Sequence, residues 1–140
     1  MNNEKVYLYV HIIFVVNKQE AVLKKPILNL LLIHLKKFAE EKFLKIQNIN
    51  GVANHLHCLL QLHPTQSLTY AVKILKEESA KWLNENKFLE NNFEWSEGYA
   101  AYSVSPSSVK QVADYINKQE EHHKTKTLES ELEVFEKIQI

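Results

Sequence analysis

The stretch Asn54-His-Leu-His-Cys-Leu-Leu-Gln-Leu62 alternates as a β-strand does, because successive side chains of a strand point to opposite faces. One face carries the two histidines, His55 and His57, with a leucine and a glutamine. The other face is entirely apolar: Leu56, Cys58, Leu60 and Leu62. The stretch therefore predicts a strand with one apolar face, as in a sheet that packs against helices on one side.

The flanking segments supply the other elements of an α+β fold. Strands are predicted at residues 6–16, 44–49, 54–62 and 97–104, with Gly51 at the turn between the second and the third. Helices are predicted at residues 26–42, at 68–85 and from Ser105-Pro106 onward, followed by a charged helical tail from about residue 125. The order β-α-β-β-α-β matches the ferredoxin-like or RRM-like arrangement, an antiparallel sheet with helices on one face, and the helix that carries Tyr115 comes after it.

Length and composition limit the classes of protein to which this chain can belong. The chain has 140 residues, of which 45% are hydrophobic, and a formal net charge of zero, so we expect one domain over residues 1–140. Its one cysteine, Cys58, excludes an internal disulfide framework. The longest apolar run, residues 6–16, is shorter than the roughly 20 residues that span a membrane and lacks a signal-peptide cleavage site. The expected location is the cytoplasm.

The positive charge comes from lysine alone. All 17 basic residues are lysines, so bidentate arginine contacts to phosphate or guanine are excluded. Residues 1–87 hold 12 lysines against 7 glutamates, whereas residues 88–140 hold 5 lysines against 10 acidic residues. If the chain binds a polyanion, the first part is the expected surface; the alternative is that these charges only solvate helix faces.

His55 and His57 are the first candidate site. Residues two apart in a strand point to the same side, so both imidazoles project from one face and can chelate a divalent cation. A third oxygen donor would leave coordination positions open for a substrate phosphate. The alternative is a pair of surface histidines on a half-exposed strand.

Tyr115 and Gln119 are the second candidate site. They stand four residues apart on the predicted last helix, at the flank of its apolar stripe, and are therefore neighbours. A phenol with a pKa near 10 needs a base, or an electrophile polarised by a metal, before it can act as a nucleophile. The amide oxygen of Gln119 is a candidate third metal ligand. The alternative is a half-buried tyrosine that only packs.

These motifs together resemble the single-tyrosine HUH transposases of the IS200/IS605 type. The resemblance rests on Asn54-His55-Leu56-His57 and on Tyr115-Ile-Asn-Lys-Gln119, and it extends over nearly the full chain. Further blocks in the same order are Gly51, Lys76-Glu-Glu-Ser79-Ala-Lys-Trp82, Trp95 with Glu97-Gly98-Tyr99, Tyr102-Ser103-Val104-Ser105 and Gln119-Glu-Glu-His-His123. The chain departs from the family at Val52-Ala53, where Met-Pro is usual, and at Ala100, where glycine is frequent.

The resemblance implies a metal-dependent transposase that cleaves and rejoins single-stranded DNA at element ends and recognises DNA hairpins. Tyr115 would be the nucleophile that forms a 5′-phosphotyrosine link, and His55, His57 and Gln119 would hold Mg²⁺ or Mn²⁺. It also implies a homodimer in which the histidines of one subunit face the tyrosine helix of the other. Lysines would make the phosphate contacts, with three candidates on the predicted helix 68–85: Lys73, Lys76 and Lys81.

Two other functions remain open at this point. A domesticated or inactive relative would bind hairpin or single-stranded nucleic acid without cleaving it. In such a relative, Val52-Ala53 would alter the turn that orients the side chains of His55 and His57. A non-catalytic single-strand-binding module of the same fold would instead use Tyr7 and Tyr9, which alternate along the first strand, as a base-stacking platform.

Overall fold

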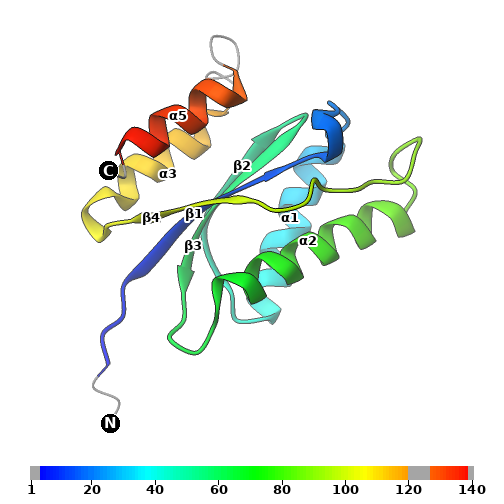
Figure 1. The fold of residues 1–140 in the computed structure, drawn as a ribbon. Helices are drawn as coiled ribbons and strands as arrows, with labels where there is room; N and C mark the ends of the chain where they lie inside the picture. The colour runs from blue at the N-terminus through cyan, green and yellow to red at the C-terminus, as the bar shows by residue number, and fades with distance from the viewer. Residues whose placement is uncertain (1–3, 120–126, 139–140) are drawn as a thin grey trace.

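The structure is a computed structural model that describes residues 4–119 and 127–138. Four strands form the sheet (Figure 1): β1 Leu8–Val15, β2 Lys45–Val52, β3 His55–Leu62 and β4 Ala100–Val104. Within the described residues, the α-helices are α1 Ile27–Glu41, α2 Leu68–Glu85, α3 Val109–Asn117 and α5 Leu128–Ile138. Two short 3₁₀ turns are η1 Asn17–Gln19 and η2 Pro106–Ser108. The predicted order of strands and helices is confirmed.

The strands are arranged in the order β2-β3-β1-β4, and each neighbouring pair is antiparallel. Strands β1 and β2 therefore run in the same direction with β3 between them, which is the split βαβ arrangement. The predicted α+β class with an antiparallel sheet is confirmed. This order puts β1 and β3 in the centre, where each has a partner on both sides.

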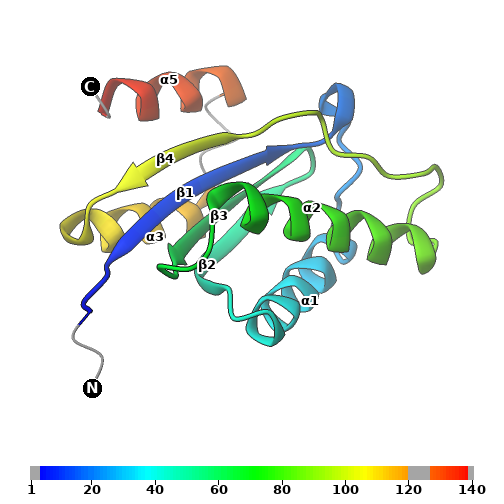
Figure 2. The ribbon, with the colours of Figure 1, turned by 60° about the horizontal axis from the view of Figure 1, so that its bottom comes forward.

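Helices α1 and α2 cover one face of the sheet (Figure 2). The apolar positions predicted for β3 point to this side and pack with Ile12 and Phe14 of β1. Helix α1 turns an apolar stripe toward them, with Leu28, Leu31, Leu32, Leu35 and Ala39 buried. Ser67 begins α2 by accepting a hydrogen bond from the Tyr70 amide at 3.0 Å, as expected of an N-cap residue.

Helices α3 and α5 lie on the other face of the sheet, next to each other (Figure 1). Ile116 of α3 packs on Leu59 and Val104, and Leu128 of α5 packs on Ile13. The prediction that the two helices of the β-α-β-β-α-β unit share one face is confirmed for α1 and α2, and the later helices α3 and α5 cover the second face. The physical reason is that the apolar stripe of α3 also needs a partner, and it buries the second face of β3, histidines included.

Several predicted boundaries shift. Gly51 pairs with Leu56 inside β2, so the turn lies at Ala53 and Asn54 and not at Gly51. Ser105-Pro106 opens the 3₁₀ turn η2, while α3 starts only at Val109. The last helix is also interrupted at Lys118 (φ −105°, ψ 25°), so Gln119 lies beyond the end of α3.

Cys58 is fully buried in the core between the sheet and the helices α1 and α2. Burial raises the pKa of its thiol to about 12, so the thiol stays protonated at neutral pH. Cys58 therefore acts as a small hydrophobic residue of the core. Among the helices within residues 4–119 and 127–138, none combines the length and apolarity that crossing a bilayer requires.

Gly51 is required by the close approach of β2 to the start of β3. A Cβ atom there would come within 2.5 Å of Leu56 Cδ2 and closer still to the carbonyl oxygen of His55. We expect Gly51→Ala to lower the free energy of unfolding by about 3 kcal/mol, because the backbone must shift to relieve the overlap.

Urea denaturation measures this loss, and Gly98→Ala is the matched control. Gly98 has a positive φ of 74° but open space around it, so alanine there should cost only about 1 kcal/mol of backbone strain. Equal losses in the two variants would contradict the steric role of Gly51.

Candidate metal and tyrosine site

His55 and His57 lie at the start of β3, on the face that α3 and α5 cover. Their backbones are held by pairing with Val15 and Ile13 of β1 on one side and with Val52 and Asn50 of β2 on the other. Both side chains are fully buried. The alternative of two half-exposed surface histidines is therefore wrong.

Glu131 of α5 completes a group of three metal-binding side chains. Its Oε2 lies 3.1 Å from Nε2 of His57 and 3.6 Å from Nε2 of His55. The three ligand atoms all lie within 4.8 Å of one another, and all three residues are buried. Two imidazole nitrogens and one carboxylate oxygen form a donor set that suits manganese and neighbouring divalent cations.

Glu131 was not among the residues predicted from the sequence, although the sequence contains a signal for it. Glu131 stands between Leu128 and Leu132, which both pack onto the sheet through α5. A carboxylate on the apolar side of an amphipathic helix is unusual, because burying a charge is costly unless it meets a partner. In this chain the partners are two histidines more than 70 residues away, and no local pattern indicates them.

Tyr115 of α3 lies beside this group in the same chain. Its ring is 6.1 Å from the His57 ring between centroids, at an interplanar angle of 62°. Burial and the hydrogen-bonded Glu131 carboxylate raise the pKa of Tyr115 above its usual value near 10, while Gln119 acts in the opposite direction. The phenol is therefore protonated at neutral pH and must lose its proton before it can act as a nucleophile.

Gln119 is fully buried and lies close enough to Tyr115 to affect its pKa. Apart from the hydrogen bond with Tyr115 through which it lowers the phenol pKa, its amide makes no hydrogen bond to the residues that the structure describes. A buried amide with so few hydrogen bonds calls for an explanation, and a bound cation would provide one. Gln119 as third ligand stays a prediction; the rest of that motif, residues 120–123, lies outside the described residues.

Two side chains contact the outer nitrogens of His55 and His57, which are the Nδ1 atoms on the side of each ring away from Glu131. Asn54 Oδ1 lies 2.7 Å from His55 Nδ1, and His11 Nε2 lies 2.7 Å from His57 Nδ1. An amide oxygen only accepts, so His55 carries a proton on Nδ1 and, when neutral, has a lone pair on Nε2. Burial, reinforced by His57 and opposed by Glu131, lowers the pKa of His11 to about 3, so this residue is neutral.

The predicted DNA-binding lysines lie away from this site. Helix α2, which carries all three, covers the opposite face of the sheet, where Lys73 and Lys81 are exposed. Lys76 Nζ instead donates to the carbonyl oxygens of Ser96 and Gly98, at 2.8 and 2.5 Å, and so holds the segment that leads into β4. Contact of these lysines with DNA stays a prediction.

The base-stacking platform considered for the first strand, Tyr7 with Tyr9, is covered at Tyr9 only. Tyr9 packs with the cluster that joins α3 to the sheet, whereas Tyr7 is 62% exposed. Because α3 occupies the face on which bases would stack, this arrangement favours packing for Tyr9.

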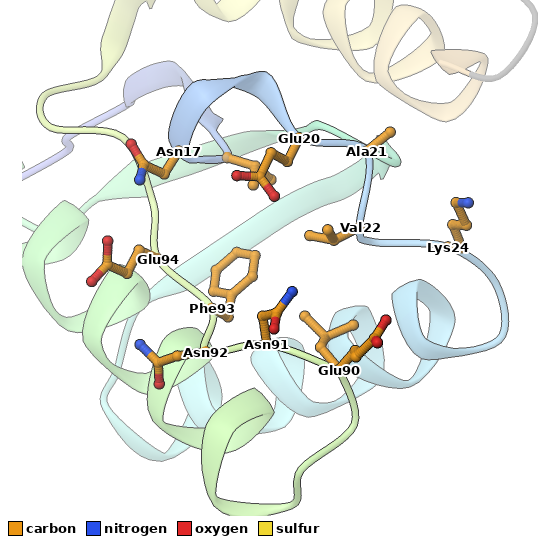
Figure 3. A pocket seen from close by; sticks show the side chains of 12 residues that line it. Asn17, Glu20, Ala21, Val22, Lys24, Glu90, Asn91, Asn92, Phe93 and Glu94 are labelled. Carbon is orange, nitrogen blue, oxygen red and sulfur yellow. The ribbon is translucent and has the colours of Figure 1, made fainter.

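A cavity of about 280 Å³ lies between residues 16–24 and 89–94 (Figure 3). It contains none of the predicted site residues. Glu20, Glu90 and Glu94 line it against a single lysine, Lys24, so its charge is unfavourable for a phosphate.

Comparison with known proteins identifies the family. The family model described as "Transposase IS200 like" matches residues 4–119. The transposases for insertion sequence element IS200 of Salmonella typhimurium and Salmonella typhi are each 34% identical over 95 residues, which is 64% of this chain and 62% of theirs. The match thus spans less than two thirds of these relatives. The chain belongs to the IS200-like transposase family, and the predicted resemblance is confirmed.

Solved structures share the fold. A candidate transposase from Deinococcus radiodurans R1 superposes with a TM-score of 0.69 at 22% identity, over 85% of this chain and 95% of that one. A REP-associated tyrosine transposase bound to a REP hairpin superposes with a TM-score of 0.60 at 14% identity, over 84% of this chain and 71% of that one. At these identities the likeness shows the fold alone.

The donor set predicts how the protein responds to a cation. We expect Mn²⁺ at about 100 times its dissociation constant to stabilise the wild type by about 2.7 kcal/mol. Glu131→Gln should weaken Mn²⁺ binding by at least about tenfold, equivalent to about 1.4 kcal/mol, because a neutral amide replaces the carboxylate. Thermal unfolding with and without Mn²⁺ measures both effects.

The matched control is Glu133→Gln, an exposed residue on the same helix, which should respond like the wild type. An unchanged response of Glu131→Gln, together with a lost response of Gln119→Ala, would contradict the role of Glu131 and assign the third ligand to Gln119.

Proposed function

We propose that this protein is a metal-dependent transposase that cleaves and rejoins single-stranded DNA through a 5′-phosphotyrosine intermediate. Family membership supports the class of reaction. The observation that carries the proposal for this chain is that Tyr115, His55, His57 and Glu131, from three separate elements, converge on one buried cluster.

Mg²⁺ or Mn²⁺ is the proposed cofactor, held by His55, His57 and Glu131 with Gln119 beside them. The donor set and the buried Gln119 amide fit such a cation. A bound cation would polarise the scissile phosphate and stabilise the charge on the leaving oxygen.

Tyr115 is the proposed nucleophile. Its oxygen forms a bond to phosphorus as the bond from phosphorus to the 3′ oxygen breaks; the phenol loses its proton, and the 3′ oxygen leaves as a hydroxyl. The phosphotyrosine conserves the energy of the broken bond, so the 3′ hydroxyl of a second DNA end can reverse the step without ATP.

DNA hairpins at element ends are the proposed substrates, and the cytoplasm is the proposed location. One structural neighbour is described as bound to a REP hairpin, which supports a hairpin as ligand. Lysine is the only residue type available for permanently charged phosphate contacts, with Lys73 and Lys81 exposed. Binding should therefore weaken steeply with salt.

A second candidate function is binding without cleavage. The whole ligand cluster is buried beneath α3 and α5, so a phosphodiester can reach it only after this cover moves. A relative in which both helices stay in place would bind hairpins and leave them uncut. Val52-Ala53, next to the turn before His55, is the other place where such a relative would differ from active members.

Replacing the nucleophile tests the two functions. The wild type, incubated with Mn²⁺ or Mg²⁺ and with 5′- and 3′-labelled single-stranded DNA from the flanks of its own gene, should form a protein–DNA adduct that resists denaturation. We expect EDTA and Tyr115→Phe to abolish the adduct, and Tyr115→Phe to retain DNA binding. Tyr70→Phe, an exposed tyrosine on α2, should behave as the wild type. Tight hairpin binding by the wild type with no adduct in either metal would favour the binding-only function.

Mixing two inactive variants tests how the site is assembled. The homodimer with shared sites, which the family resemblance implies, should regain adduct when Tyr115→Phe and His57→Ala are mixed, because one of the two composite sites is then intact. A site built within each chain, which the contact of Tyr115 with its own His57 supports, should regain none. We expect no recovery in the mixture, and recovery would contradict assembly within one chain.

A further inference from the structure

His11 of β1 is a buried histidine outside the ligand set, and it contacts one of the ligands. Its Nε2 lies 2.7 Å from Nδ1 of His57, and both side chains are fully buried. The two rings are 5.0 Å apart between centroids, at an interplanar angle of 31°. Because Ile13 is the register partner of His57, His11 is its diagonal neighbour on the same face of the sheet.

The proton in this contact determines which nitrogen of His57 can bind a cation. A hydrogen bond between two imidazole nitrogens needs one ring to donate and the other to accept. His57 turns its Nε2 toward Glu131 Oε2, at 3.1 Å. A ligand nitrogen must be unprotonated. A neutral His57 that binds through Nε2 therefore keeps its proton on Nδ1 and donates it to Nε2 of His11.

We propose that His11 is a positioning residue, which holds His57 in the tautomer and orientation that present Nε2 to a divalent cation. The inference rests on the proposed function, which makes His57 a ligand. Asn54 has the equivalent place beside His55, where its Oδ1 lies 2.7 Å from Nδ1. Both ligand rings thus have their outer nitrogen held by a side chain and their Nε2 directed toward Glu131.

A neutral imidazole suits this place for an electrostatic reason. The cluster already buries the Glu131 carboxylate, and a second carboxylate behind His57 would add an uncompensated charge whenever the cation is absent. His11 accepts the hydrogen bond without adding charge.

Three variants separate the hydrogen bond from simple packing. His11→Phe keeps a ring but removes the acceptor, His11→Gln can place an amide oxygen where Nε2 lies, and Ile13→Val trims the neighbouring buried residue without touching the hydrogen bond. Titration calorimetry with Mn²⁺ measures the dissociation constant, and thermal unfolding in EDTA verifies that each variant folds.

We expect His11→Phe to weaken Mn²⁺ binding by about 10- to 100-fold, as loss of such outer partners does elsewhere. His11→Gln should recover most of the affinity and Ile13→Val should bind as the wild type does. The proposal is overturned if folded His11→Phe binds Mn²⁺ normally, if His11→Gln is as weak as His11→Phe, or if Ile13→Val is equally weak.

The wild type supplies a test that does not depend on the folding of any variant. Nitrogen-15 NMR of the protein saturated with Mg²⁺ reports the tautomer of each imidazole, and we expect the His57 proton on Nδ1. A proton on Nε2 would overturn the inference. Failure of the wild type to bind Mn²⁺ would overturn the proposed metal site and this inference with it, whereas normal wild-type binding with an insensitive His11→Phe would overturn the inference alone.

Discussion

The two central strands are buried on both faces, and this constraint determines the character of the site. Helices α1 and α2 remove one face of β1 and β3 from water, and α3 and α5 remove the other. Any polar side chain on these strands must then find its partners inside the protein, because an unsatisfied buried group costs free energy. His11, His55 and His57 meet this demand through one another, through Asn54 and through Glu131.

Helices α3 and α5 cover the second face of the sheet and also supply side chains of the candidate site. Helix α3 carries Tyr115 to the ring of His57, and α5 carries Glu131 to the Nε2 atoms of both histidines. The same burial that strengthens electrostatic interactions within the cluster also closes it to a phosphodiester.

Local patterns predicted those parts of the fold that depend on neighbours in sequence. The alternation of residues 54–62 and the helices predicted at residues 26–42 and 68–85 all correspond to observed elements. The sequence-based expectations were wrong where contacts between residues far apart in the sequence determine the structure. The histidine face of β3 is polar in sequence and suggested exposure, but α3 covers it. Gly51 suggested a turn, yet its small size serves the close approach of β2 to Leu56.

The sequence by itself determined the order of the elements, the family, the placement of His55 and His57 on one face, and the nearness of Tyr115 and Gln119. Each of these follows from spacings of two to four residues or from motifs in a fixed order. Only the tertiary structure decided that Glu131 joins the histidines and that His11 supports one of them. These contacts join residues 74 and 46 positions apart. Packing of α5 on the sheet creates the first contact and pairing of β1 with β3 creates the second, and no local periodicity encodes either.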